Sequence, residues 1–257
     1  MSLAGFTLMM TSRRFNILKE EHRVVNQDMT RPLAHYYISS SHNTYLDGNQ
    51  LTGRSSLEAY HTALERGCRS LELDLWDGPD NEPIIYHGRT LTSKISARDV
   101  LENSILPYAF TASEYPLILS IENHLSSGQE EVFAGHVKKI FDELLYDGEV
   151  EDMKQLPSPQ QLRRKILIKG SPRKLKSKAM RDLINICHAI KMNTADYRGL
   201  VDQCYHVNSL SEEKARDWCK HSRKEVVEHT SRQLVRVYPS CVRIASSNFS
   251  PSESKTN

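Results

Sequence analysis

Three carboxylates and one amide lie on or beside short segments with the pattern of β-strands, and together they offer hard oxygen donors. These residues are Asn43, Glu72, Asp74 and Glu122. Donors of this kind bind Ca²⁺ or Mg²⁺, and a flexible set with several carboxylates suits Ca²⁺ better. Without a cation, three neighbouring carboxylates would repel and raise one another's pKa values. The alternative is a solvated strand edge, where single acidic residues usually lie.

Two histidines, His42 and His87, end further strand-like segments. Imidazole takes or gives a proton near pH 7 and therefore serves general acid–base catalysis. Beside a metal-bound phosphate, one histidine could stabilise the charged phosphate while the other protonates the leaving group. The alternative is that each imidazole caps a loop through hydrogen bonds. Zinc is not expected, because the sequence has neither a CxxC pair nor an HExxH motif.

Basic and polar residues that can hold anions come later in the chain. Lys169 and Ser209 are joined by Arg236, whose guanidinium can bind two phosphate oxygens at once, and Tyr238 could stack on a ring. This combination predicts a polyphosphorylated substrate with one scissile phosphate near the cation. Residues 163–181 contain nine Lys and Arg residues and no acid, so we interpret most of this stretch as an exposed, solvated basic connector.

Strand-like and helix-like segments alternate from about residue 35. The pattern predicts helices over residues 55–67, 96–110, 128–146 and one or two within 211–235, and strands over residues 35–43, 68–78, 82–88, 115–124, 165–170, 203–211 and 234–239. Repeated alternation favours parallel strands with crossover helices. In a (β/α) barrel the active site lies at the carboxyl ends of the strands. The polar residues above fall at those ends, which favours one shared site.

Composition sets further limits. The chain has 257 residues, of which 39% are hydrophobic and 26% charged, as in globular proteins. A net charge of +2 gives no reason to expect a nucleic-acid partner, and no window of 18 apolar residues predicts a membrane span. Five cysteines without a CxxC pair favour a reduced, cytoplasmic chain. The apolar residues 1–10 precede two arginines, which is the reverse of a signal peptide.

A family resemblance joins these motifs. The segments concerned are "PLAHYYISSSHNTYL", "GCRSLELDLWDG", "EPIIYHGRTLTSKI", "YPLILSIENH", "LPSPQQLRRKILIKG" and "LVRVYP…SSNFSP". In this order they resemble the eukaryotic phosphoinositide-specific phospholipases C, most closely the delta and zeta types. The likeness runs from about residue 31 to 251 and covers the X box and the first part of the Y box.

The resemblance implies an α/β fold, a distorted TIM barrel built from X and Y halves. It implies an X half at residues 31–170, a short basic linker at 171–182 and a truncated Y half at 183–251. Residues 1–30 would be the remnant of an EF-hand region, and residues 252–257 a disordered tail. Because the likeness stops before an eighth strand, we expect an open edge between strands seven and one.

The resemblance also implies Ca²⁺-dependent hydrolysis of phosphatidylinositol 4,5-bisphosphate to diacylglycerol and inositol trisphosphate. By motif, His42 and His87 match the catalytic pair and Glu72 or a neighbouring carboxylate matches the base. The metal ligands would be Asn43, Glu72, Asp74 and Glu122, and the substrate would contact Lys169, Ser209, Arg236 and Tyr238. The implied partners are a phosphoinositide lipid and, transiently, a membrane surface, and no particular protein partner is indicated. The rim residues expected to enter lipid are small, namely Leu51, Leu91 and Val242.

One departure concerns recognition of the substrate, since Ser171 stands where the family usually has a lysine. Two alternatives to an active phospholipase C remain open. The chain could be a catalytically weak or inactive phosphoinositide-binding protein, which the truncated Y half favours. It could also be another phosphodiesterase that acts on glycerophosphodiesters. Lys169 and Arg236 argue against that second alternative, because such substrates carry no additional phosphates.

Overall fold

The structure is a computed structural model that describes residues 1–12, 19–150, 152–191, 203–240 and 242–243. Contacts divide the chain into two units, residues 1–30 and residues 31–257. The first unit contains the helix α1 (Leu3–Thr11), which begins where the Ser2 hydroxyl accepts a hydrogen bond from the Gly5 amide, and the 3₁₀ turn η2 (Glu20–Arg23). In the described part of the chain, no helix combines the length and the apolar character needed to cross a bilayer.

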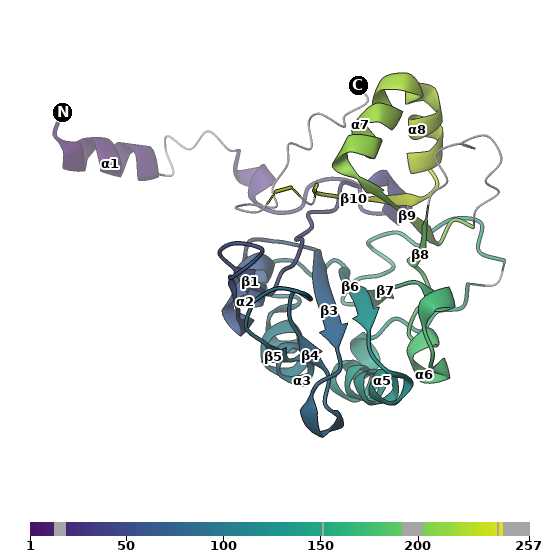
Figure 1. Ribbon diagram of the computed structural model, residues 1–257. Coiled ribbons are helices and arrows are strands. Elements are labelled where there is room, and N and C mark those ends of the chain that lie inside the picture. The colour runs from purple at the N-terminus through teal and green to yellow at the C-terminus, as the bar shows by residue number, and fades with distance from the viewer. Residues whose placement is uncertain (13–18, 151, 192–202, 241, 244–257) are drawn as a thin grey trace. The chain divides into compact units, whose positions relative to one another are not determined.

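The second unit begins with a 3₁₀ turn and alternates strands with helices (Figure 1). Its strands are β1 (Leu46–Asp47), β2 (Arg54–Ser55), β3 (Ser70–Trp76), β4 (Ile84–Ile85), β5 (Ile95–Ser96), β6 (Leu117–His124), β7 (Ile166–Lys169), β8 (His188–Lys191), β9 (His206–Ser211) and β10 (Leu234–Tyr238). Its α-helices are α2 (Leu57–Glu65), α3 (Ala97–Asp99), α4 (Leu106–Tyr108), α5 (Ser127–Phe141), α6 (Lys178–Arg181), α7 (Glu212–His221) and α8 (Arg223–Thr230). The π-helical η5 (Val100–Ile105) joins α3 to α4, and 3₁₀ turns form η3 (Leu33–His35), η4 (Pro79–Asn81), η6 (Asp142–Leu144) and η7 (Pro172–Lys174).

Parallel pairing forms the frame of this unit. Strand β3 pairs with β6, β6 with β7, β8 with β9 and β9 with β10, in each case parallel. A single parallel bridge between Gly170 and His188 connects the two sheets, and another joins Ser40 to Ser70. The described residues therefore contain seven parallel positions in the order Ser40, β3, β6, β7, β8, β9, β10. This is the strand series of a (β/α) barrel, as the sequence predicts.

The alternating pattern of β3 decides which side chains face the helices. Leu71, Leu73 and Leu75 are fully buried against the helical layer that includes Tyr60 and Leu64 of α2. Each buried leucine of this kind contributes about 1.5–3 kcal/mol to folding. Since side chains alternate along a strand, the acidic residues between these leucines point to the opposite face, the barrel interior. The same residues that build the outer core thus direct the carboxylates inward.

Short polar caps begin the helices that follow the strands. The hydroxyl of Ser56 accepts a hydrogen bond from the Ala59 amide at the start of α2. Ser126 caps α5 in the same way, and Ser211, the last residue of β9, caps α7. A serine at this position stabilises a helix by about 1 kcal/mol. Strand and helix are therefore separated by very few residues, so the chain reverses direction directly after the strand, as a (β/α) barrel requires.

One of the predicted strands is wrong as a barrel strand, and another is much shorter than predicted. The segment 35–43 forms only the single bridge at Ser40, after a 3₁₀ turn that follows Pro32. The segment 82–88 contains only the two-residue β4, which runs antiparallel to β3 and on to β5. The reason is length, because the connection from β3 to β4 is a short turn, whereas a parallel strand needs a crossover of a dozen residues or more.

The sequence prediction also missed a strand. Residues 188–191 form β8, whose four residues carry no clear apolar alternation. The preceding segment 171–182, predicted as a linker, folds into η7 and α6, and it buries Leu175 and Met180 in the main core. The amphipathic spacing of these two residues explains the packing, because the lysines between them remain at the surface. Most of the basic residues of the stretch are indeed exposed, but the backbone is not a bare connector.

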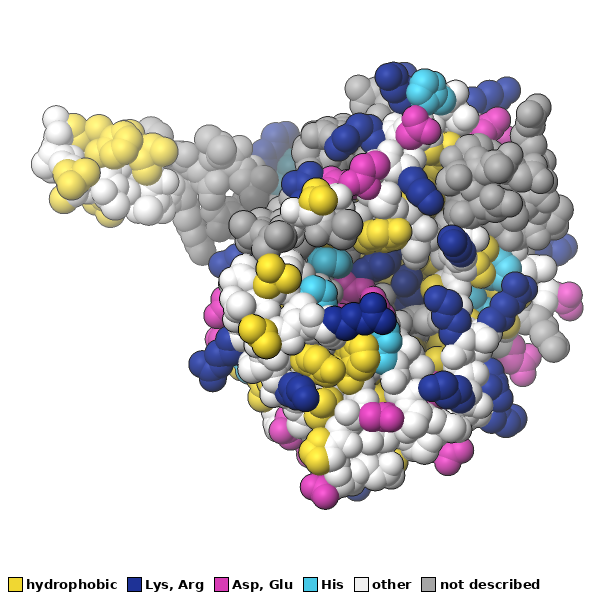
Figure 2. Space-filling model, in the orientation of Figure 1, with side chains coloured by type: hydrophobic (Ala, Val, Ile, Leu, Met, Phe, Trp, Pro, Cys, Tyr) yellow, Lys and Arg dark blue, Asp and Glu magenta, His cyan; other side chains and the backbone are white. Residues whose placement is uncertain are grey.

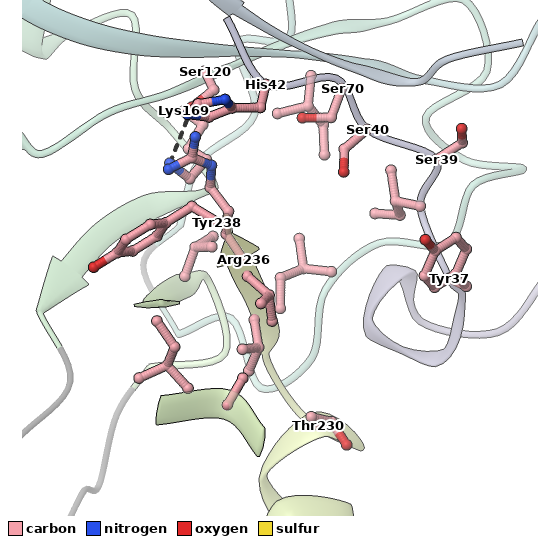
Figure 3. A pocket seen from close by; sticks show the side chains of 18 of the residues that line it. Tyr37, Ser39, Ser40, His42, Ser70, Ser120, Lys169, Thr230, Arg236 and Tyr238 are labelled. Carbon is pink, nitrogen blue, oxygen red and sulfur yellow. Dashed lines mark hydrogen bonds between the residues drawn. The ribbon is translucent and has the colours of Figure 1, made fainter. Parts of the chain in front are cut away.

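The barrel is not closed. Within the described ranges no strand pairs with the outer edge of β10, which matches the expected open edge between the seventh and first positions. A cavity of about 810 Å³ lies there, lined by residues 36–42 on one side and 234–239 on the other (Figure 3). Its lining includes the apolar residues Ile118 and Val207 as well as His42, Lys169 and Arg236.

Candidate active site

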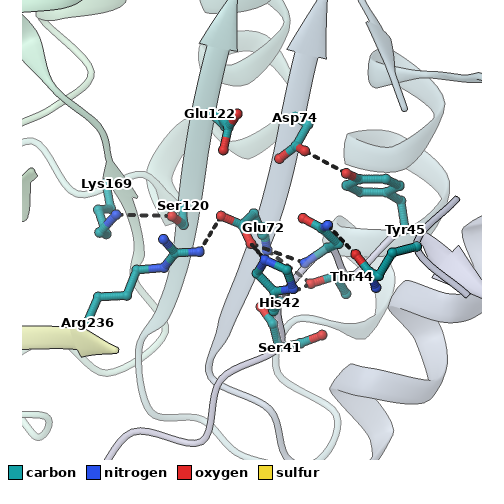
Figure 4. A network of polar contacts seen from close by, with 12 residues as sticks. Ser41, His42, Thr44, Tyr45, Glu72, Asp74, Ser120, Glu122, Lys169 and Arg236 are labelled. Atoms are coloured by element: carbon teal, nitrogen blue, oxygen red, sulfur yellow. Dashed lines mark hydrogen bonds and ion pairs between the residues drawn. The ribbon is translucent and has the colours of Figure 1, made fainter. Parts of the chain in front are cut away.

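Strand register gathers the three predicted carboxylates at one end of the barrel. Asp74 on β3 pairs with Glu122 on β6, and Glu72 lies two residues before Asp74 on the same face. One carboxylate oxygen from each residue lies within 4.8 Å of the others, close enough to bind a single ion. Figure 4 shows Asp74 and Glu122 nearer the arrowheads of their strands and Glu72 deeper in the barrel. The site is therefore at the carboxyl ends of the strands.

Asp74 is the most constrained of these carboxylates. It is only 3% exposed, and its Oδ2 accepts a 2.6 Å hydrogen bond from the Tyr45 hydroxyl. Its Oδ1 is buried and has no partner among the described residues. Burial, followed by the charges of Glu72 and Glu122, raises the pKa of Asp74 to about 8. A buried oxygen without a partner and a disfavoured charge are both relieved by a bound cation, so this donor set fits a divalent ion.

Glu72 connects the carboxylates to the basic groups and to one histidine. Its Oε2 accepts a 3.1 Å hydrogen bond from the backbone amide of Asn43 and lies 4.0 Å from Nε2 of His42. Its Oε1 forms an ion pair with the guanidinium of Arg236. Glu72 is 3% exposed, and a buried carboxylate needs such partners. Arg236 thus supplies positive charge at Glu72, as Figure 4 shows.

Asn43, the predicted amide ligand, lies in the left-handed region of the backbone with φ 46°. Asparagine tolerates this conformation better than most residues. Its Nδ2 donates a 2.7 Å hydrogen bond to Oε1 of Gln50. This contact fixes the orientation of the amide and leaves its Oδ1 as the atom that could bind a cation. The carboxamide is therefore held by a neighbour in the same loop.

The two predicted histidines differ in their surroundings. His42 is held among charged groups, and burial, opposed mainly by Glu72, lowers its pKa below the usual 6.5. The charges of Arg236 and His87 lower the pKa further, which shows that both lie near this imidazole. His87 donates a 2.6 Å hydrogen bond from Nδ1 to the Gln50 carbonyl. That contact fixes the tautomer of neutral His87 and leaves its Nε2 for proton transfer.

The basic side of the site comes from β7 and β10. Lys169 is 7% exposed and donates a 3.1 Å hydrogen bond to Ser120, its in-register neighbour on β6. Burial and then the charge of Arg236 lower the pKa of Lys169 to about 8. The guanidinium of Arg236 lies 5.8 Å from the ring centre of Tyr238. Figure 3 shows Lys169, Arg236 and His42 together, with Tyr238 beside them.

Ser209, the remaining predicted residue, lies on β9 in register with Arg236. It is half-buried and therefore faces the barrel interior beside that guanidinium. All predicted site residues thus lie at one end of the barrel. Figure 2 shows acidic, histidine and basic side chains together in a hollow of the surface. Two predicted rim leucines are exposed, Leu51 by 48% and Leu91 by 86%, and a 3.0 Å backbone hydrogen bond joins them.

Sequence reasoning missed several residues that hold the site. Tyr45 binds Asp74 and Gln50 orients both Asn43 and His87, although both belong to the polar loop that opens the motif. His124 donates a 3.0 Å hydrogen bond to Glu122 and stacks on Trp76 with ring centres 3.9 Å apart. The only signal for His124 was its place two residues after Glu122, which puts both on one face of β6.

Family comparison agrees with this geometry. Residues 29–172 match the phosphatidylinositol-specific phospholipase C X domain, and residues 180–256 match the Y domain of the same family. The chain belongs to the phosphatidylinositol-specific phospholipase C family. The resemblance inferred from the motifs is thereby confirmed, and so is the barrel fold class, with the barrel open.

Curated relatives of this chain include proteins named as phosphodiesterases and one named as inactive. It is 39% identical to mouse 1-phosphatidylinositol 4,5-bisphosphate phosphodiesterase delta-3 over 98% of its length, and 40% identical to human zeta-1 over the same share. It is also 38% identical to mouse inactive phospholipase C-like protein 2. The chain spans 37% of delta-3, 48% of zeta-1 and 26% of the inactive relative.

Solved structures give the same result for the fold. The crystal structure of PLC21 from L. pealei superposes with a TM-score of 0.85 at 35% identity, covering 98% of this chain and 36% of the other. PLC21 from S. officinalis gives 0.86 at 34% identity, with the same coverage. A phosphatidylinositol-specific phospholipase C from S. aureus, 14% identical with a TM-score of 0.52, shares the fold.

Proposed function

We propose that the chain hydrolyses phosphatidylinositol 4,5-bisphosphate to diacylglycerol and inositol 1,4,5-trisphosphate in a Ca²⁺-dependent reaction. One observation carries the proposal: three carboxylates within 4.8 Å of one another lie between an imidazole and a set of basic groups. The names of the delta and zeta relatives support the same substrate. Acids on one side and bases on the other suit a divalent cation and a phosphate ester together.

Asn43, Glu72, Asp74 and Glu122 would hold the ion, which when bound neutralises charge on the phosphoryl oxygens. Glu72 is also the group placed to accept the proton of the inositol 2-hydroxyl as that oxygen attacks phosphorus. Attack forms a cyclic phosphate, which water then opens.

The histidines divide the remaining work. The neutral His42 imidazole, 4.0 Å from Glu72, would donate a hydrogen bond to the phosphoryl oxygen that gains charge. His87 would act in its protonated form, with Nδ1–H donated to the Gln50 carbonyl, and would give its Nε2 proton to the diacylglycerol oxygen, which leaves the neutral imidazole. General acid–base catalysis of this kind contributes about 10²- to 10⁴-fold to a rate. Water that opens the cyclic phosphate returns a proton to His87 in the reverse role.

Lys169, Ser209, Arg236 and Tyr238 would bind the inositol ring and its phosphates. Because the substrate is a lipid, the site must face a membrane. The exposed side chains of Leu51 and Leu91, whose backbones are joined by a hydrogen bond, form an apolar surface beside the loop that holds His87. Val242 is 78% exposed as well. Three small apolar residues favour shallow and transient insertion, because membrane binding scales with buried apolar area. We therefore also propose a cytoplasmic protein that acts at membranes, which the thiols of Cys68, Cys187 and Cys204 support.

The test is release of inositol phosphates from vesicles that contain phosphatidylinositol 4,5-bisphosphate, with Ca²⁺ or with a chelator. We expect turnover only with Ca²⁺, and a loss of about 10²-fold or more in Glu72→Gln. Glu131→Gln on the outer surface of α5 is the matched control and should be fully active. Turnover that survives the chelator, or that Glu72→Gln leaves intact, would contradict the proposal.

The second candidate is a phosphoinositide-binding protein without turnover, which the 38% identity to an inactive relative favours. The complete set of carboxylates and both histidines favours the enzyme. His87→Ala separates the two, because it removes the acid without touching the basic groups. If the unsubstituted chain binds vesicles without turnover, it is a binding protein. If the unsubstituted chain turns over the lipid and His87→Ala binds vesicles but does not, it is an enzyme.

A further inference from the structure

A lysine at the end of β8 lies on the inner face of the barrel, although nothing above assigns it a role. Lys191 pairs in register with Ser209 on β9, and Ser209 pairs with Arg236 on β10. Residues in register on neighbouring strands project from the same face of a sheet. Arg236 faces the interior, because it forms an ion pair with Glu72. Lys191 therefore projects into the barrel mouth as well.

The other edge of β8 gives the same direction independently. The bridge between Gly170 and His188, with a 2.6 Å hydrogen bond from the Ala189 amide to the Gly170 carbonyl, puts Cys187 in register with Lys169. Both Lys169 and Cys187 line the central cavity. His188 is paired with Gly170 and therefore shares its outward face, and alternation along β8 then puts Ala189 and Lys191 on the inner face. The pairing of β8 with the end of β7 and the pairing through β9 to β10 thus both put Lys191 on the inner face of the barrel.

The charge distribution around the mouth indicates what this lysine meets. The acids of the mouth come from β3 and β6, whereas β7 to β10 contribute basic and hydroxyl side chains, among them Lys169, Lys191, Ser209 and Arg236. Lys169 and Arg236 are engaged with Ser120 and Glu72. Lys191 is exposed and makes no hydrogen bond or ion pair with another described residue.

We propose that Lys191 binds a phosphate group on the inositol ring and sets the preference for multiply phosphorylated head groups. The inference rests on the proposed function, since it names a further contact of the same substrate. Strands lie 4.7–4.9 Å apart, so Lys191 and Arg236 are about 10 Å apart across Ser209. A lysine is a flexible point charge that can meet a phosphate between them without a fixed geometry. Cations spaced in this way suit a head group that carries phosphates on more than one side.

Lys191→Met tests the proposal, with Lys191→Arg as the conservative variant and Lys214→Met, an exposed lysine on α7, as the matched control. Binding of inositol 1,4,5-trisphosphate is measured by calorimetry. Turnover is then compared on phosphatidylinositol 4,5-bisphosphate, phosphatidylinositol 4-phosphate and phosphatidylinositol. We expect Lys191→Met to weaken trisphosphate binding about tenfold and to lower kcat/KM on the bisphosphate while turnover on phosphatidylinositol is unchanged. Lys191→Arg and Lys214→Met should behave like the unsubstituted chain.

A rescue variant locates the contact. Ser171 follows Lys169 by two residues and lies next to Ala189, so a lysine at 171 would enter the mouth from the neighbouring strand. Ser171→Lys combined with Lys191→Met should regain trisphosphate binding, which a merely structural role of Lys191 would not allow. Equal trisphosphate affinity in the unsubstituted chain and in Lys191→Met would overturn this inference alone. A chain that neither binds the trisphosphate nor turns over any of the lipids would overturn the proposed function, and this inference with it.

Discussion

Cation binding should release almost one proton at neutral pH, because Asp74 holds that proton in the cation-free protein. Burial, then the charges of Glu72 and Glu122, raises the pKa of Asp74 to about 8. A carboxyl group with this pKa is ~90% protonated at pH 7 and ~10% protonated at pH 9. Since a metal ligand must be deprotonated, the apparent Ca²⁺ affinity should rise about tenfold per pH unit below pH 7 and level off near pH 9.

The assay is a calorimetric Ca²⁺ titration at pH 7 in two buffers with different heats of ionisation. The difference between the observed heats gives the number of protons released, expected to be about 0.9 per ion. His42 cannot supply this proton, because burial lowers its pKa and leaves the imidazole neutral at pH 7. Equal heats in both buffers would refute the reasoning, since they would show that Asp74 is already ionised.

Lys169 is a second possible source of the released proton, because burial and the charge of Arg236 lower its pKa to about 8. Proton release should persist in Lys169→Met if Asp74 is the source. Asp74→Asn should bind Ca²⁺ more weakly, with an affinity that no longer rises with pH. A release that disappears in Lys169→Met would assign the proton to the lysine instead.

The thermal stability of the protein should also depend on the protonation of Asp74. A raised carboxyl pKa means that the folded state holds the proton more tightly than the unfolded state does. The stability from this proton is fully present below the ordinary pKa of 3.8 and is lost as pH rises through about 8. With a chelator present, Tm should therefore fall between pH 6 and pH 9, and Ca²⁺ should restore it by replacing the proton.

Two substitutions test the residues that support the site. A Cβ on Gly88 would lie 2.0 Å from the Trp76 ring, so Gly88→Ala should lower the free energy of unfolding by about 1–3 kcal/mol in a denaturant titration, and an unchanged midpoint would contradict this packing. His124→Phe keeps a ring to stack on Trp76 but removes the donor to Glu122, so Ca²⁺ affinity measured by calorimetry should fall about tenfold with Tm unchanged, and unaltered affinity would show that His124 has no positioning role.

The sequence predicted seven barrel positions, and seven are found among the described residues, but two compensating errors give this agreement. The segment 82–88 has the composition of a buried strand, yet its turn from β3 is too short for a crossover. Residues 188–191 carry no alternation that marks a strand, and their pairing with β7 and β9 depends on the whole barrel. Local sequence patterns were therefore enough to predict the fold class. Which segments form the barrel strands depends on strand pairing, which local patterns do not record.

The clustering of the three carboxylates was easier to predict than the strands that position them. Glu72, Asp74 and Glu122 were found because an acid in an apolar strand has no structural use, and register then brings them together. Tyr45 and Gln50 were missed, because a tyrosine and a glutamine in a polar loop have many uses. Their contacts depend on how the loop folds back over β3, which no spacing in the sequence records.

The barrel mouth has an acidic side and a basic side, and the ion pair between Arg236 and Glu72 joins the two. Glu72 is buried and needs a positive partner, and Arg236 provides it from the last described strand. A bound cation would take over the charge of Glu72, so Arg236 would be released toward an anion on its own side. Cation and phosphate should therefore bind cooperatively. A cation bound to Glu72 leaves Arg236 available for the phosphate, and a phosphate bound to Arg236 leaves Glu72 available for the cation. The ion pair thus couples the two halves of the site through charge alone, with no movement of the strands.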